Sequence, residues 1–310
     1  MILTSVRIIV MRRPLLILSA VATVSLVLSG CASTAFGDEG NKAGVQVLAS
    51  FYPLQYVAQQ VGGKLVDVSS LTPPGAEPHD VELSPREVRT VSEADVVVYL
   101  SGFQAAVDEG VAARQPTNVV NAAHTADLVA WAHPKRGEGT LDPHFWLDPH
   151  RLERLAGPVA AALTKADPSH ADTYAANAKR LEMSLTDLDT KYRTGLASCK
   201  DRTIVTSHEA FGYLSDRYDL SQVGMSGLDP DAEPSPARLR QIRDLVRKKG
   251  VTTIFSEHLV SPKVAQTLAA DLGVKSAVLD PVESLTDPRS NYRDVMLKNL
   301  SVLRTALDCK

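Results

Sequence analysis

The sequence predicts an α/β protein with two lobes, each built on a parallel sheet, joined by a long rigid helix. Short strands alternate with helical segments from Gly44 to about residue 123, and the same alternation returns from residue 202 to the C-terminus. Between the two, residues 149–197 favour helix throughout and are rich in alanine. With 310 residues, 44% of them hydrophobic, the chain is long enough for two medium-sized domains with cores of their own.

The first lobe is predicted over residues 44–165. Its strands are expected at residues 45–51, 65–71, 95–100 and 117–123, and a helix with a glycine pair at its end is expected at 53–63. Ser84 followed by Glu87 is a capping box that starts a second helix. The strand DVVVYL is apolar on both faces, which indicates a parallel sheet covered on both sides.

The connecting helix is predicted within residues 166–198. Pro168 stands at a first-turn position and Gly195 near the end, so the helix has roughly 28 residues and is about 40 Å long. The second lobe, 199–310, repeats the pattern of the first. Its strands are expected at 202–207, 221–227, 252–257 and 276–280, and its helices at 209–218, 236–249, 262–272 and 290–307.

The first 30 residues have the order of a signal peptide. Arg7, Arg12 and Arg13 precede an apolar run that ends in small residues, and this run is too short for a convincing membrane span. Leu28-Ser29-Gly30-Cys31 resembles a bacterial lipobox, so Cys31 is expected to become the acylated N-terminus, with residues 31–43 as a flexible tether. We therefore expect an exported protein, anchored by lipid on the extracytoplasmic face of the cell membrane. Met11 is an alternative start.

The net charge limits the kinds of partner that the protein can bind, and the cysteines bear on whether it contains a disulfide. Without the signal peptide, 30 basic residues face 36 acidic residues, and this acidic balance argues against a nucleic-acid partner. The remaining cysteines are Cys199 and Cys309. A disulfide is the default expectation in an exported protein, and two unrelated buried thiols are the alternative.

Four side chains capable of binding a metal occupy similar places in the predicted fold. His79 follows the strand at 65–71, His144 lies in LDPHFWLDP, His208 follows the strand at 202–207, and Asp280 closes the last strand. Loops beyond the carboxyl ends of parallel strands gather at one edge of a sheet, where ligands bind. Their spacing is far wider than that of a zinc finger or an HExxH helix, and it suits a cleft to which each lobe gives two ligands. The residues alone leave open whether each histidine is a ligand or an ordinary loop residue.

Five motifs occur along the chain in this order: EPHDVELSPREVRTVSEADVVVYLSG, LDPHFWLDP, TIVTSHEAFGYL, EPSPARLRQI and VLDP. Together they resemble the metal-binding lipoproteins of ABC-type zinc and manganese importers, the ZnuA-like and TroA-like families. The resemblance implies two α/β lobes, a rigid connecting helix and one metal between the lobes. It assigns the four ligand positions to His79, His144, His208 and Asp280. Manganese-specific members tend to carry glutamate where this chain has His208, so the zinc branch is favoured, in line with the preference of imidazole for zinc.

The chain departs from the family pattern in two places. The segment before the second ligand holds only His124 and His133, so the long histidine-rich loop of many zinc members is expected to be absent or reduced. After Gly102 the sequence FQAAVDEGVA replaces the usual glycine, glutamate and tryptophan pattern, which leaves the local helix and the wall of the cleft undefined.

Two further carboxylates have open roles. Glu209 and Glu257 are candidates to accept a hydrogen bond from a ligand imidazole, and the alternative for each is a surface acid or an acid at a helix N-terminus. Trp146 and Phe211 are expected to pack around the site.

Three functions are compatible with these features. The favoured one is a monomeric, non-enzymatic receptor that carries Zn²⁺ as its transported ligand, with Mn²⁺ or iron as the alternative, to an ABC permease and its ATPase subunit. A zinc hydrolase with Glu257 or Glu209 as base is disfavoured, because catalytic zinc keeps an open coordination position that four protein ligands would fill. A structural or adhesive lipoprotein would explain the anchor but not four ligand positions. The connecting helix is expected to permit only a small closure around the ion.

Overall fold

The computed structural model describes residues 44–130 and 140–310. The predicted signal peptide, the tether and the lipidated Cys31 lie outside the described residues, as does His133. Among the described residues, no helix has both the length and the apolar character needed to cross a membrane.

The first lobe is a four-stranded parallel sheet in the order β2-β1-β3-β4. Its strands match the four predicted ones and are β1 (Val45–Ala49), β2 (Val66–Ser70), β3 (Val96–Tyr99) and β4 (Val119–Asn121). Its helices are α1 (Tyr52–Gly62), the 3-10 turn η1 (Gly63–Leu65), α2 (Pro85–Glu93), α3 (Ala105–Arg114) and α4 (Ala123–Ala126). The capping box of Ser84 and Glu87 is formed at the start of α2, as predicted.

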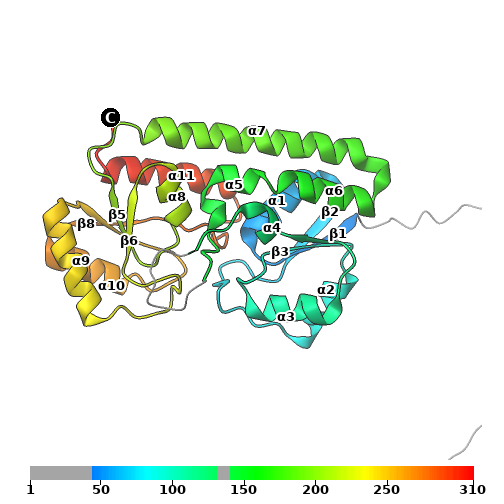
Figure 1. Cartoon of the computed structure of the whole chain (residues 1–310), viewed down its shortest axis with the longest axis horizontal. Coiled ribbons are helices and arrows are strands. Elements are labelled where there is room, and N and C mark those ends of the chain that lie inside the picture. The colour runs from blue at the N-terminus through cyan, green and yellow to red at the C-terminus, as the bar shows by residue number, and fades with distance from the viewer. Residues whose placement is uncertain (1–43, 131–139) are drawn as a thin grey trace, which may run out of the picture. The chain divides into compact units, whose positions relative to one another are not determined.

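The second lobe repeats this topology, with strand order β6-β5-β7-β8 and all pairs parallel. Its strands are β5 (Thr203–Thr206), β6 (Ser221–Gly224), β7 (Thr253–Ser256) and β8 (Lys275–Val278). Its helices are α8 (Gly212–Arg217), α9 (Pro236–Lys249), α10 (Lys263–Leu272) and α11 (Tyr292–Ala306). The predicted fold class, with two parallel α/β lobes, is confirmed (Figure 1).

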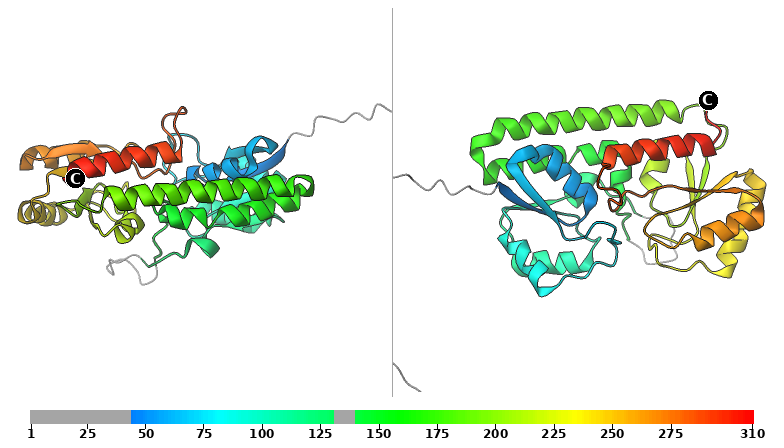
Figure 2. Two further views of the ribbon diagram at one scale, coloured as in Figure 1. Left: turned by 90° about the horizontal axis from the view of Figure 1, so that it is seen from above. Right: turned by 180° about the vertical axis from the view of Figure 1, so that it is seen from behind.

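The lobes are joined by the predicted long helix. The connection comprises η2 (Phe145–Leu147), α5 (Pro149–Glu153), α6 (Ala156–Ala166), the 3-10 turn η3 (Pro168–His170) and α7 (Ala171–Gly195). The 25 residues of α7 span about 37 Å at 1.5 Å per residue. Helix α7 packs against α1, α5 and α6 and, towards its C-terminal end, lies beside α11 (Figures 1 and 2).

Alternate residues of the central strands enter different cores. In the first sheet Val47 belongs to a core cluster on one face and Leu48 to a cluster on the other; in the second sheet Ile204 and Val205 separate in the same way. Val47 and Ile204 belong to the same cluster, which therefore extends through both lobes. Because their inner faces share one packed core, the lobes resist a wide hinge motion.

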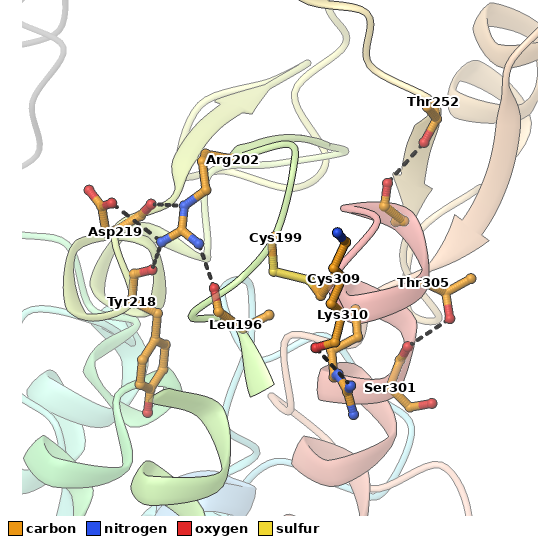
Figure 3. Close-up of a disulfide and its surroundings, with 12 residues drawn as sticks. Leu196, Cys199, Arg202, Tyr218, Asp219, Thr252, Ser301, Thr305, Cys309 and Lys310 are labelled. Carbon is orange, nitrogen blue, oxygen red and sulfur yellow. Dashed lines mark hydrogen bonds and ion pairs between the residues drawn. A yellow bond between two sulfur atoms is a disulfide. The ribbon is translucent and has the colours of Figure 1, made fainter. Parts of the chain in front are cut away.

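A disulfide joins Cys199, just beyond α7, to Cys309, just beyond α11 (Figure 3). The two cysteines also face each other as an antiparallel bridge. Backbone amides on either side bond across it, from Lys310 to Ser198 and from Lys200 to Asp308. The expected disulfide is confirmed, and it ties the C-terminus to the end of the connecting helix.

Candidate metal site at the lobe junction

His79 enters the site from the loop that follows β2. Its backbone N–H donates to Glu77 Oε1 at 3.0 Å, which fixes the turn inside the proline-rich segment. The imidazole stands edge-on against Phe103, with ring centroids 4.7 Å apart. Phe103 belongs to the segment whose departure from the family pattern left the wall undefined, and the structure places its ring against His79 and Trp146.

His144 is fully buried in the segment between the first lobe and α5. Asp142 Oδ1 accepts from both its backbone N–H at 3.0 Å and its ring Nδ1–H at 2.7 Å, so Nε2 faces the lobe junction. Trp146 lies beside the ring, with a centroid distance of 5.2 Å, and donates through Nε1 to the carbonyl of Pro281 in the second lobe. The predicted packing role of Trp146 thus also joins the lobes.

His208 comes two residues after β5 and is also fully buried. Its ring Nδ1 donates to Glu257 Oε2 at 2.7 Å, and its backbone N–H donates to Glu257 Oε1 at 3.1 Å. Glu257 itself is buried directly after β7. Of the two carboxylates considered from the sequence, Glu257 is therefore the one that orients His208. Glu209 pairs instead with Arg238 of α9, at 3.3 Å.

A carboxylate other than the expected Asp280 lies with the three predicted histidines. The structure gathers His79, His144, His208 and Glu283, with one ligand atom of each lying within 4.8 Å of all the others. Asp280 is not part of this group. Its Oδ1 accepts the backbone N–H of Val282 at 2.8 Å, closing a turn after β8.

The geometry of this turn explains why Glu283, and not Asp280, lies beside the imidazoles. Val282 has φ of +59°, a left-handed conformation that is strained for a β-branched residue. The bent backbone directs the longer side chain of Glu283 to the junction while Asp280 stabilises the bend. Both acids occur in the same short segment of sequence, so the only available signal was their proximity to the strand end, and only the backbone conformation distinguishes them.

Five of the six separations between the four ligand atoms match those of a tetrahedral zinc site, and the sixth, from His79 to His208, lies within 4.8 Å. Glu283 Oε1 lies 3.4, 3.2 and 3.4 Å from Nε2 of His79, His144 and His208. His144 Nε2 lies 3.3 Å from His79 Nε2 and 3.4 Å from His208 Nε2. Zinc bonds of about 2.0–2.1 Å imply ligand-to-ligand separations of roughly 3.3–3.4 Å in a regular tetrahedron. These four groups could therefore hold one zinc ion with little rearrangement.

The electrostatics of the group are those of a buried cation site. Burial alone would raise the pKa of Glu283, but its hydrogen bonds with His144, His208 and His79 hold that pKa well below its usual range. Burial likewise opposes protonation of His208, yet Glu257 and Glu283 raise its pKa well above the ordinary value. Burial lowers the pKa of His79, and Glu283 only partly offsets this. Carboxylate charge in an apolar enclosure stabilises positive charge at the centre, whether carried by a proton or a metal.

Only one side of the cluster approaches solvent. The side chain of His79 is 14% exposed, whereas those of His144 and His208 are fully buried and that of Glu283 is 1% exposed. Glu77 stands beside His79, with its Oε1 4.0 Å from the ring Nε2, and burial together with the nearby charge of Glu283 raises the pKa of Glu77 to about 8. His79 and Glu77 therefore form the more exposed side of the cluster.

Comparison with known proteins gives a consistent result. Residues 47–306 match the profile of the family described as "ZnuA: Zinc-uptake complex component A periplasmic". The zinc-binding protein AdcA of Streptococcus pyogenes serotype M6 is 35% identical over 290 residues, 85% of this chain, but the chain spans only 56% of that relative. ZnuA of Bacillus subtilis, a high-affinity zinc uptake protein, is 31% identical over 94% of this chain and 97% of its own length. The Zn(II)-bound ZnuA-like domain of Streptococcus pneumoniae AdcA has a TM-score of 0.73 and 35% identity, covering 86% of this chain and all of that one.

Proposed function

Because this chain belongs to the ZnuA family of zinc-uptake proteins, we propose that it is the extracytoplasmic receptor of an ABC importer, which captures Zn²⁺ and delivers it to the membrane permease. The observation that carries the proposal is the convergence of three imidazoles and one carboxylate, with five of their six ligand-atom separations at 3.2–3.4 Å and all of them within 4.8 Å. His79, His144, His208 and Glu283 are the proposed ligands.

The donor set favours zinc as the transported ion over manganese or iron. Imidazole suits zinc, whereas manganese sites rely on carboxylate and water oxygens in octahedral geometry. Three neutral imidazoles and one carboxylate leave a site of net charge +1 around Zn²⁺, low enough to be tolerated in the buried junction. The four protein atoms also complete the coordination of zinc and leave no position for an activated water, which favours binding over hydrolysis.

Capture proceeds by dehydrating the ion at a largely preformed site. His144 and His208 are each held through Nδ1 by a buried carboxylate, so their Nε2 atoms are oriented before the metal arrives. His79 lies on the exposed side and completes the coordination. The shared core and α7 limit the accompanying movement of the lobes to a small closure.

The proposed partners follow from the same role. The receptor would meet an ABC permease with its ATPase subunit, act as a monomer, and be held at the membrane through lipidated Cys31. Glu257 is proposed to position His208.

A competition titration with a chromophoric chelator tests the proposal. Zinc is expected to bind more tightly than manganese, and His208→Ala should weaken zinc binding strongly, because it removes one of four ligands. Tighter binding of manganese, or an unchanged zinc Kd in His208→Ala, would contradict it.

A further inference from the structure

A guanidinium group lies where three segments of the fold meet, behind the proposed zinc site. Arg217, the last residue of α8, places its Nε 2.5 Å from Asp189 Oδ1 of α7 and 3.1 Å from Asp148 Oδ1 at the start of α5. One side chain thus bridges the second lobe, the connecting helix and the segment that leaves the first lobe.

The two carboxylates are buried and firmly held. Asp148 is 4% exposed and Asp189 is 6% exposed. Asp189 also accepts from Tyr218 Oη at 3.0 Å and from Arg193 at 2.7 Å, while Asp148 caps α5 by accepting the backbone N–H of His150. The hydrogen bond with Asp189 raises the pKa of Arg217 despite its partial burial, so the guanidinium remains charged.

The bridge lies on the two chain segments that carry the two most buried imidazoles. Asp148 follows His144 by four residues through the tight turn η2, and α8 begins four residues after His208 and packs against η2. The Nε2 atoms of His144 and His208 lie 3.4 Å apart, yet the rings come from different lobes. Asp142 and Glu257 set how each ring is turned. Tyr213 of α8 joins the two ligand segments by donating through Oη to the carbonyl of Asp142 at 2.8 Å, and Arg217 adds a charged contact to Asp148.

We propose that Arg217 is a positioning residue for zinc, which fixes the separation of His144 and His208 by tying α8 to Asp148 while Asp189 anchors it to α7. This inference rests on the proposed zinc-binding function. A buried ion bridge contributes little net stability compared with apolar packing, but it defines one arrangement among several that packing alone would allow. Both carboxylates lie closest to the same atom, Arg217 Nε, whose N–H donates to Asp189, while Asp148 is held by the charge of the guanidinium.

Arg202 provides a matched control. It is another partly buried arginine of the second lobe, and it donates to the carbonyls of Leu196, Tyr218 and Asp219, at 2.5, 2.7 and 2.8 Å (Figure 3). It contacts the residue that follows α8, Tyr218, and within the described part of the chain its hydrogen bonds involve neither Asp148 nor the η2 turn. Removing it should cost folding stability without changing the separation of the imidazoles.

The test compares Arg217→Met and Arg202→Met in three measurements: zinc Kd by chelator competition, the ligand-field absorption of bound Co²⁺, and the free energy of unfolding. We expect Arg217→Met to raise the zinc Kd about tenfold and to alter the tetrahedral Co²⁺ bands, because the two imidazoles separate. We expect Arg202→Met to lose stability but keep the wild-type Kd and Co²⁺ spectrum.

A folded Arg217→Met protein with wild-type Kd and Co²⁺ spectrum would overturn the inference, and so would equal changes in both variants. If Arg217→Met does not fold, Asp148→Asn decides by the same criteria, since it weakens the bridge while keeping the shape of the side chain and an oxygen to cap α5. Failure of the wild-type protein to bind zinc would overturn the proposed function and this inference together, so the two failures are distinguishable.

Discussion

Replacing Glu283 by Gln, with Asp280→Asn as its control, separates the ligand set seen in the structure from the one expected from the sequence. The two acids lie three residues apart in one turn, but only Glu283 reaches all three imidazoles, at 3.2–3.4 Å. Glutamine keeps the size of the side chain and removes its charge. Asparagine at position 280 keeps an oxygen that can accept the Val282 N–H and so preserves the turn.

The magnitude follows from the burial of Glu283. Removing one partner from a fully desolvated charge pair costs about 3–5 kcal/mol, which corresponds to a rise in Kd of roughly 100-fold to several thousand-fold. Asp280→Asn leaves the cluster intact, so its Kd should remain within about threefold of wild type, the range expected for substitutions away from buried charges.

Chelator competition gives both constants, and thermal unfolding with and without zinc provides an independent check. A zinc concentration of 100 times the Kd stabilises the folded state by about 2.7 kcal/mol, so the zinc-induced shift in Tm should largely disappear in Glu283→Gln and persist in Asp280→Asn. A greater loss of affinity in Asp280→Asn would refute the structural assignment and restore Asp280 as the fourth ligand.

Four further outcomes are expected. Glu257→Gln should weaken zinc binding about 10- to 100-fold, since its carboxylate orients His208, whereas Glu209→Gln should leave the Kd nearly unchanged; equal effects in the titration would contradict these roles. Cys199→Ser should lower the free energy of unfolding in urea by up to about 5 kcal/mol, because the disulfide closes a loop with a sequence separation of 110. The substitution should not change the zinc Kd. An unchanged urea midpoint would contradict the stabilising role of the disulfide. Burial alone would raise the pKa of Asp189, but the hydrogen bonds that it accepts lower this pKa below its unfolded value of about 4. The stability that Asp189 contributes is therefore full above about pH 4 and is lost as the pH falls through the folded pKa. The free energies of unfolding of Asp189→Asn and wild type should become equal only at low pH, and a difference that stays constant with pH would contradict the shift. Solution scattering should show only a small decrease in radius of gyration on adding zinc, and a large domain closure would contradict the shared core.

Much of the fold could be predicted because its signals are local. The strand segments of the described residues, the capping box at Ser84 and the helix-favouring stretch before Gly195 each depend on residues close in sequence. The ends of elements were less certain, as in the 3-10 turn η3 that precedes α7 where one continuous helix was expected from Pro168. The domain boundaries proposed from the sequence remain predictions.

Three of the four clustered residues were also predictable, because each histidine lies in a motif of the family and two of them closely follow a strand. The fourth was not, because Asp280 and Glu283 have the same charge and share one turn. Their difference lies in the left-handed backbone of Val282, which sequence rules would not assign to a β-branched residue. The contact of Phe103 with His79 could not be predicted for a similar reason, since it depends on how two loops from different strands meet.

The sequence by itself therefore determined the class of the fold and the imidazole-rich character of the site, which depend on residue type and order, and the structure decided that Cys199 and Cys309 are bonded. Only the tertiary structure decided which carboxylate lies beside the three imidazoles, which acid accepts from His208, and how Arg217 joins three segments. These are contacts between residues as much as 204 positions apart. Their geometry is set by the packing of both lobes on one shared core, to which no local sequence pattern corresponds.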